Sequence, residues 1–246
     1  MELVITDSYE DMSRAAADVI AAQITEDPAC VLGLATGSTP IGLYAQLVKD
    51  YDDGIVSFAD VTTFNLDEYR GLDPDHDQSY RYFMQKNLFD LVNVDPARTH
   101  VPNGAEPDAA KACQAYEQAI ALAGGIDLQL LGLGHNGHIG FNEPCDHFPV
   151  ETHVVDLTES TIQANGRLFA CADDVPRQAY TMGIGTIMKA RKVLMVVSGA
   201  DKADIVDAVV NGPVKPEVPA SVLQLHPDVT IIVDAEAGAK CKLSEK

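Results

Sequence analysis

Short apolar runs alternate along the chain with segments whose apolar residues recur at helical spacing. Several of the runs are apolar nearly throughout, which is typical of strands that are covered on both faces of a parallel sheet. The predicted strands are Ala29–Ala35, Val61–Leu66, Ile126–Leu133, His153–Leu157, Ala179–Ile184, Val193–Ser198 and Val229–Asp234.

Helices are predicted between these strands from their caps and their spacing. Ser79 can cap one helix, a second begins after Asp108 and ends at Gly124-Gly125, and a third follows Asp201. Their expected apolar or inward-facing positions are Tyr80, Phe83, Met84, Leu88 and Leu91, then Cys113, Tyr116 and Ile120, then Ile205, Val206 and Val209.

This alternation predicts an α/β fold, namely a doubly wound, mostly parallel sheet flanked by helices in a Rossmann-like arrangement. The 246 residues are enough for one large domain spanning 1–246. The stretch with Pro213, Pro216 and Pro219 is interpreted as a surface connection, because a further strand follows it. Ligands of such folds bind at the carboxyl ends of the strands, so the chemistry is expected in those loops.

The net charge of the chain excludes some classes of binding partner. With 17 Lys+Arg against 37 Asp+Glu, the formal net charge is −20, which argues against binding to nucleic acid or to an anionic membrane. The chain begins without a basic region followed by an apolar stretch, and its apolar runs are far too short to span a bilayer. Cys30, Cys113, Cys145, Cys171 and Cys241 include no CxxC pair and indicate free thiols. We therefore expect a cytoplasmic protein, and the sequence leaves self-association open.

The first loop that is a candidate for ligand binding is Leu34–Ile41, which follows a predicted strand. Pro40 suits the first position of a helix, and Ser38 or Thr39 suits the cap before it. A turn rich in glycine and hydroxyls at a helix start presents backbone N–H groups to a phosphate. The alternative is a helix that is merely well capped. The sequence lacks the glycine–lysine pattern of a Walker loop.

The second loop is Phe64–Arg70, in which the adjacent carboxylates Asp67 and Glu68 follow an apolar strand. Their side chains are expected to diverge, so that one faces the cleft and the other a structural partner. A carboxylate at that place could remove a proton beside a carbonyl or an imine. A solvated loop or a helix start is the alternative.

The third loop, Leu131–Pro144, is the richest in glycine and histidine. Its GxGxxG, from Gly132 to Gly137, matches a dinucleotide motif, but Gly140 and Pro144 disfavour the helix that NAD binding requires. A metal site is a second interpretation, although its HxxH lacks the helical spacing of zinc proteases. The residues concerned are His135, His138, Glu143 and His147.

A third interpretation is acid–base chemistry. The glycines would hold His138 rigidly at the cleft, with Glu143 close enough to orient it. An imidazole backed by a carboxylate is a suitable acid–base group near neutral pH.

Several segments in order along nearly the whole chain resemble the glucosamine-6-phosphate deaminase family, which is related to the 6-phosphogluconolactonases. The most specific is Gly134–Pro144, with the core GHIGFNEP. The others are Ala35–Pro40, Phe64–Tyr69, Thr181–Thr186, Ser198–Ala203 and Leu223–His226.

The resemblance implies conversion of glucosamine 6-phosphate and water to fructose 6-phosphate and ammonia, without a metal or an organic cofactor. It assigns ring opening to His138, supported by Glu143 and Asn136, and assigns removal of the C2 proton and its delivery to C1 to Asp67. It also assigns the phosphate to a turn and two cations. These residues are Thr36, Gly37, Ser38, Thr39, Arg167 and Lys202.

Two departures and two alternatives accompany this interpretation. Some family members carry aspartate where this chain has Asn136, and an asparagine can orient a group but cannot act as a base. Regulated members have a longer C-terminal tail than this chain, so regulation by N-acetylglucosamine 6-phosphate is not expected. The alternatives are an enzyme for galactosamine 6-phosphate and a non-catalytic sugar-phosphate sensor, which would retain phosphate-binding residues but lose the acid–base set.

Overall fold

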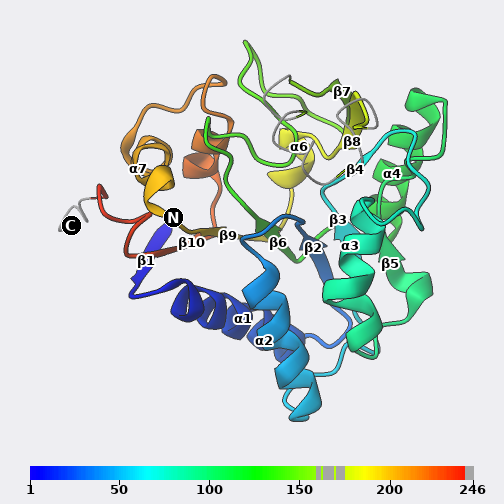
Figure 1. Ribbon diagram of the computed structural model, residues 1–246, viewed down its shortest axis with the longest axis horizontal. Coiled ribbons are helices and arrows are strands. Elements are labelled where there is room, and N and C mark those ends of the chain that lie inside the picture. Colours follow the sequence, from blue (N-terminus) through cyan, green and yellow to red (C-terminus); the bar gives the residue numbers. More distant parts are fainter. Residues whose placement is uncertain (159–161, 163–168, 170–174, 242–246) are drawn as a thin grey trace.

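The computed structural model describes residues 1–158, 162, 169 and 175–241. Its largest element is a seven-stranded parallel sheet in the order β1-β10-β9-β6-β2-β3-β5, which crosses the centre of Figure 1. The strands are β1 (Glu2–Thr6), β2 (Val31–Leu34), β3 (Thr62–Asn65), β5 (Thr99–His100), β6 (Leu128–Leu131), β9 (Lys192–Val197) and β10 (Val229–Asp234).

Helices cover both faces of this sheet, as the apolar strands predict. In Figure 1, α1 (Tyr9–Glu26) and α2 (Ile41–Asp52) lie below the sheet, whereas α6 (Ile184–Ile187) and α7 (Ala203–Asn211) lie above it. The prediction of a doubly wound, mostly parallel α/β fold is therefore confirmed. The remaining helices are α3 (Tyr80–Asn87) and α4 (Ala109–Leu122), with 3₁₀ turns η1 (Phe89–Leu91), η2 (Pro96–Arg98), η4 (Ala200–Lys202) and η5 (Pro219–Leu225).

Two of the predicted helix starts are confirmed by their capping hydrogen bonds. The Ser79 side chain accepts from the backbone N–H of Tyr82, and the Asp108 side chain accepts from that of Lys111. Each bond satisfies one of the N–H groups that a helix start leaves without a backbone partner. The third predicted helix is α7, which buries Val206 and Val209.

The strands predicted at 153–157 and 179–184 exist but do not join the parallel sheet. β7 (His153–Asp156) and β8 (Gln178–Thr181) form a separate antiparallel sheet with β4 (Asp67–Tyr69), in the order β4-β8-β7. None of the four residues of β7 is buried, which differs from a strand covered on both faces. This small sheet places Asp67 directly opposite Thr181.

Two local predictions are wrong. The helix after β2 begins at Ile41, with Pro40 as its N-cap and without a capping bond from Ser38 or Thr39. The proline-containing stretch includes η5, whose residues Pro219–Leu223 are buried, so it is not wholly a surface connection.

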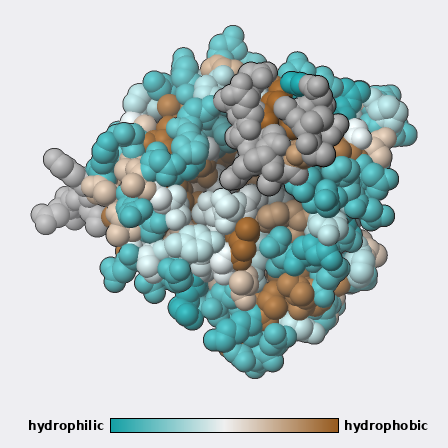
Figure 2. All heavy atoms as spheres, in the orientation of Figure 1, coloured by the Kyte–Doolittle hydropathy of each residue, from teal (hydrophilic) through white to brown (hydrophobic). Residues whose placement is uncertain are grey.

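The outer surface agrees with the acidic composition. Figure 2 shows a face covered mainly by hydrophilic residues, with small separate apolar areas. No helix in the described part of the chain is long and apolar enough to cross a lipid bilayer.

Candidate active site

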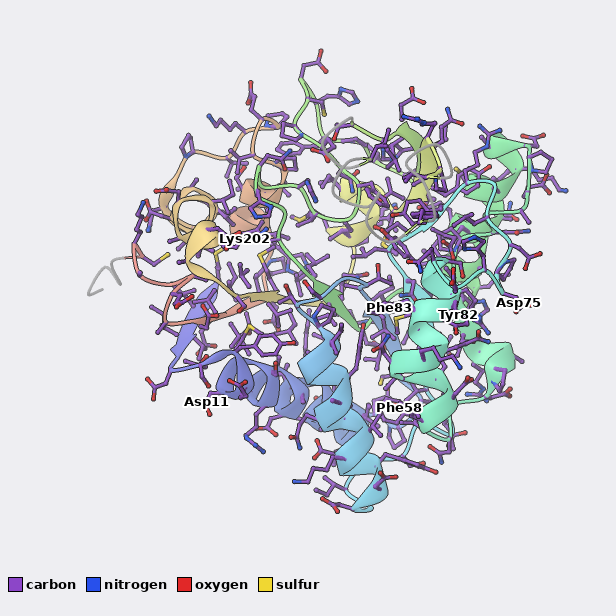
Figure 3. All side chains as sticks on the ribbon, viewed as in Figure 1. Asp11, Phe58, Asp75, Tyr82, Phe83 and Lys202 are labelled. Carbon is purple, nitrogen blue, oxygen red and sulfur yellow. The ribbon has the colours of Figure 1, made fainter. Side chains whose placement is uncertain are left out.

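The three loops singled out by the sequence follow neighbouring strands of the sheet. β9, β6, β2 and β3 are adjacent and parallel, so the loops after their carboxyl ends meet at one edge. The segments after β9 and β6 are in direct contact, because Nζ of Lys202 donates to the carbonyl oxygen of Leu133 at 2.8 Å. Figure 3 places Lys202 at the start of α7, beside the loop that follows β6.

The turn after β2 offers several backbone donors. Gly37 has φ of +109°, a conformation that favours glycine. The N–H groups of Gly37, Ser38 and Thr39 have no hydrogen-bond partner within the described residues. They precede the start of α2, where the helix dipole also attracts an anion. This turn therefore has the features of a phosphate site, although its side chains do not cap the helix.

The hydroxyl of Tyr9, at the start of α1, stabilises this turn through hydrogen bonds. It donates towards the carbonyl oxygens of Thr39 at 3.0 Å and Ser38 at 3.3 Å, and it accepts from the N–H of Gly42 at 2.9 Å. Tyr9 was not predicted to contribute, because nothing in the sequence brings it close to a turn about thirty residues later.

The third loop holds the His138 ring in a defined orientation. Nδ1 of His138 lies 2.8 Å from Oδ1 of Asn136 and 3.3 Å from Oε1 of Glu143. Nδ2 of Asn136 donates to Oε2 of Glu143 at 2.5 Å, which fixes the amide orientation and leaves Oδ1 as an acceptor for the ring. In the neutral form of the ring, this network favours the proton on Nδ1, so that the lone pair lies on Nε2.

Gly134 allows the ring to take this position. A Cβ at residue 134 would lie 2.3–2.4 Å from three atoms of the His138 ring. The loop is closed by the N–H of Gly134, which donates to the carbonyl oxygen of His138 at 2.9 Å. The glycine therefore provides room for the imidazole and does not form part of a dinucleotide motif.

Asp67 lies beside the same loop. Its Oδ2 is 3.5 Å from the position that a Cβ of Gly140 would occupy, and its carboxylate accepts no hydrogen bond within the described residues. The side chain is 6% exposed. Burial, with a smaller contribution from the neighbouring Glu68 carboxylate, raises the pKa of Asp67 to about 8.

Glu68 has a structural role, as predicted for one of the two carboxylates. Its Oε1 accepts from the backbone N–H groups of Tyr69 at 2.8 Å and Tyr80 at 3.0 Å, and its Oε2 accepts from that of Arg81 at 2.9 Å. Two of these donors begin α3, so Glu68 anchors the start of that helix. Burial raises the pKa of Glu68, whereas the three donors oppose the shift.

Lys202 is a partly buried cation at the same edge of the sheet. Burial lowers the pKa of its ammonium group, and the charge of Asp201 partly compensates. Its one hydrogen bond to the residues that the structure describes uses a single N–H, which leaves two for an anion. The second predicted cation, Arg167, lies outside the described residues.

The metal and dinucleotide interpretations receive no structural support. His135 contacts Asp201 at 2.5 Å and His147 contacts Asp146 at 2.7 Å, so these rings do not gather around His138. Over residues 1–158 and 175–241, no three His, Cys, Asp or Glu side chains are grouped so that they could hold a metal ion. No helix begins within Gly132–Gly137, which a dinucleotide motif would require.

Comparisons with known sequences cover nearly the whole chain. Residues 6–232 match the profile of the family described as glucosamine-6-phosphate isomerases/6-phosphogluconolactonase. A glucosamine-6-phosphate deaminase of Clostridioides difficile (strain 630) is 55% identical over 240 residues, which span 98% of this chain and 96% of the relative. One of Clostridium perfringens (strain 13 / Type A) is 53% identical over 242 residues, spanning 98% of this chain and 100% of the relative.

Solved structures agree with these sequence matches. A monomeric glucosamine-6-phosphate deaminase superimposes with a TM-score of 0.95 at 44% identity, covering 98% of this chain and 100% of the other. A 6-phosphogluconolactonase from Trypanosoma brucei superimposes with a TM-score of 0.77 at 20% identity, covering 98% of each chain, which shows a shared fold alone.

Proposed function

The chain belongs to the family of glucosamine-6-phosphate isomerases and 6-phosphogluconolactonases, and we propose that it converts glucosamine 6-phosphate and water to fructose 6-phosphate and ammonia. The high identity to deaminases over nearly the full length supports this activity. The fold-level likeness to lactonases does not indicate their activity, because one fold hosts many chemistries.

The observation that carries the proposal is the pairing of two different acid–base groups at one loop. Asp67 has a buried carboxylate that accepts no hydrogen bond from the described part of the chain, and its pKa is raised to about 8. Nδ1 of the His138 imidazole is held by Asn136 and Glu143. Their environments suit them to two separate proton transfers, which an aldose–ketose isomerisation of a cyclic sugar requires.

The first transfer opens the pyranose ring. Nε2 of His138 takes the proton of the anomeric hydroxyl and returns it to the ring oxygen as the C1–O5 bond breaks, which gives the open-chain aldehyde. Asn136 and Glu143 keep the proton on Nδ1 and stabilise the imidazolium that forms briefly. Asn136 acts here through orientation, since an amide does not exchange protons as a base.

The second transfer takes place at C2 and C1. Asp67 removes the C2 proton, the electrons move onto the aldehyde oxygen, and that oxygen takes a proton from the substrate's ammonium group on C2, which gives an enolamine. Asp67 then returns the proton to C1, which leaves an imine at C2. Water adds to that imine and ammonia departs, so that the ketone of fructose 6-phosphate remains.

The phosphate end is assigned to the turn after β2 and to two cations. The N–H groups of residues 37–39, which have no partner among the described residues, and two N–H groups of Lys202 can donate to phosphate oxygens. We propose Arg167 as the second cation, on the resemblance alone. A few cations concentrated at one site suit a protein of net charge −20 that binds a dianion.

We infer that residues 1–246 act as one domain on a small amino-sugar phosphate in the cytoplasm, without a nucleic-acid or membrane partner. The acidic charge and the absence of a disulfide pattern in the sequence support this setting.

Incubation of the protein with glucosamine 6-phosphate and, separately, with galactosamine 6-phosphate tests the activity, with ammonia and ketose phosphate as the measured products. Release from galactosamine 6-phosphate would favour the alternative of an enzyme for that sugar, and release from neither sugar would indicate a sensor.

A further inference from the structure

The carboxylate of Asp234 lies at the same edge of the sheet and has no assigned role. It is the last residue of β10, which pairs with β9, and it is 6% exposed. No Lys, Arg or His of the described chain lies within ion-pair distance of it. A buried carboxylate without a cation is costly unless hydrogen bonds stabilise it.

Asp234 gathers its donors mainly from the turn that follows β9. The Ser198 hydroxyl donates to Oδ2 at 2.5 Å, and the N–H of Gly199 lies 3.0 Å from Oδ2 and 3.2 Å from Oδ1. The N–H of Ala237 completes the set, at 2.8 Å from Oδ1. Hydrogen bonds to an ionised acceptor are stronger than neutral ones, so the carboxylate ties this turn firmly to β10.

The turn so held leads directly to Lys202. Gly199 adopts φ of +102° and ψ of 145° and precedes η4, and the N–H of Lys202 donates to the carbonyl oxygen of Gly199 at 3.0 Å. The orientation of this one peptide therefore sets the path of the next three residues. At their end, Nζ of Lys202 reaches the carbonyl oxygen of Leu133.

We propose that Asp234 is a positioning residue for the phosphate site: its carboxylate fixes the Ser198–Gly199 turn so that Lys202 points at the phosphate of the substrate. The proposal rests on the function proposed above. Asp234 itself does not touch the substrate, and it acts through the backbone of the turn.

The Asp234→Asn variant tests this role, because an amide NH₂ would face the Gly199 N–H or the Ser198 hydroxyl and lose at least one bond. We expect KM for glucosamine 6-phosphate and the inhibition constant of inorganic phosphate to rise on the order of tenfold, with kcat changed less than about threefold. Ser198→Ala removes one donor without creating a clash, and a rise of about two- to threefold is expected. The control is Asp204→Asn on α7, an exposed carboxylate that pairs with Lys240 and should leave both constants unchanged.

Combination with Lys202→Ala separates positioning from general destabilisation. If Asp234 acts through Lys202, the double variant binds phosphate no more weakly than Lys202→Ala alone. An equal added loss in both backgrounds would overturn the proposal, as would unchanged binding in Asp234→Asn and Ser198→Ala. If Lys202→Ala itself leaves phosphate binding unchanged, the assignment of the phosphate site fails first, and the proposal about Asp234 falls with it.

Discussion

Asp67 and Glu68 are neighbours in β4, yet Glu68 accepts three backbone N–H groups and Asp67 accepts none within the described residues. Adjacent side chains of a strand point to opposite faces, so one carboxylate reaches the start of α3 and the other reaches the loop of His138. The same dipeptide thus supplies a structural hydrogen-bond acceptor, Glu68, and a carboxylate that is available as a base, Asp67.

Asp67→Asn should lower turnover by about 10²–10⁴-fold with a much smaller change in KM, because it removes a positioned base and retains the shape of the side chain. Steady-state kinetics of ammonia release measure the effect. Asp75→Asn, at an exposed position in the following loop, is the control and should behave like the wild type. Retention of more than about a third of wild-type turnover by Asp67→Asn would remove this residue from the mechanism.

Glu68→Gln should act on stability. The substitution leaves one oxygen to accept and places an NH₂ against a backbone donor at the start of α3, so we expect a loss of about 1–3 kcal/mol in the free energy of unfolding. Denaturant titration provides the value. A fully stable variant with abolished turnover would instead make Glu68 the base.

The raised pKa of Asp67 predicts a specific dependence of stability on pH. Between the ordinary value of 3.8 and about 8, the folded protein holds a proton on Asp67 that the unfolded chain releases. The contribution of this residue to stability is therefore complete below about pH 4 and declines as the pH rises towards 8, by about 1.4 kcal/mol per pH unit at most. Asp67→Asn should gain stability over the wild type at pH 8 but not at pH 4, as measured by thermal unfolding. A constant difference between the two proteins across this range would contradict the shift.

Because Gly134 packs against the His138 imidazole, two similar glycine substitutions should have different effects. Gly134→Ala places a methyl group within 2.4 Å of the His138 ring, so the ring must move and turnover should fall more than about tenfold. Gly132→Ala meets nothing within 4 Å and should retain turnover. Comparable loss in both variants would indicate that the loop tolerates no side chain for reasons unrelated to His138.

The sequence predicts the parallel sheet better than the elements around it. Its central strands are continuous apolar runs, and that signal requires no tertiary information. The helix α1 was not predicted, because much of its buried side consists of small residues such as Ala16, Ala17 and Ala21, which contrast weakly with their surroundings. The strand β4 was missed since two of its three residues are acidic, and only its pairing with β8 makes it a strand.

The sequence also indicates the loops of the site but not the contacts that shape them. The divergence of Asp67 and Glu68 follows from strand geometry and could be predicted. The role of Tyr9 could not, because it depends on how α1 packs beside α2. The orientation of His138 depends on a three-residue hydrogen-bond network with Asn136 and Glu143, for which the sequence shows only proximity.

The phosphate assignment predicts the result of removing the cation. Lys202→Ala should weaken binding of both glucosamine 6-phosphate and inorganic phosphate by on the order of 10²-fold, since part of a dianion loses its partner. Lys189→Ala, an exposed cation beyond α6, should have no effect. Competition by inorganic phosphate measures the affinities without turnover, and unchanged affinity would make Lys202 a mere surface charge.

The central claim is that His138 opens the ring and Asp67 transfers the proton between C2 and C1. Hydrogen isotope exchange at C1 of fructose 6-phosphate tests it most directly. With ammonia present in deuterated buffer, exchange requires proton transfer by Asp67 on the open-chain imine but no closure of the pyranose ring. We predict that His138→Gln retains this exchange while its turnover of cyclic glucosamine 6-phosphate is severely slowed, and that Asp67→Asn loses both. Equal loss of exchange in the two variants would show that His138 serves the step at C2 or the structure of the loop, and the two-stage account would be contradicted.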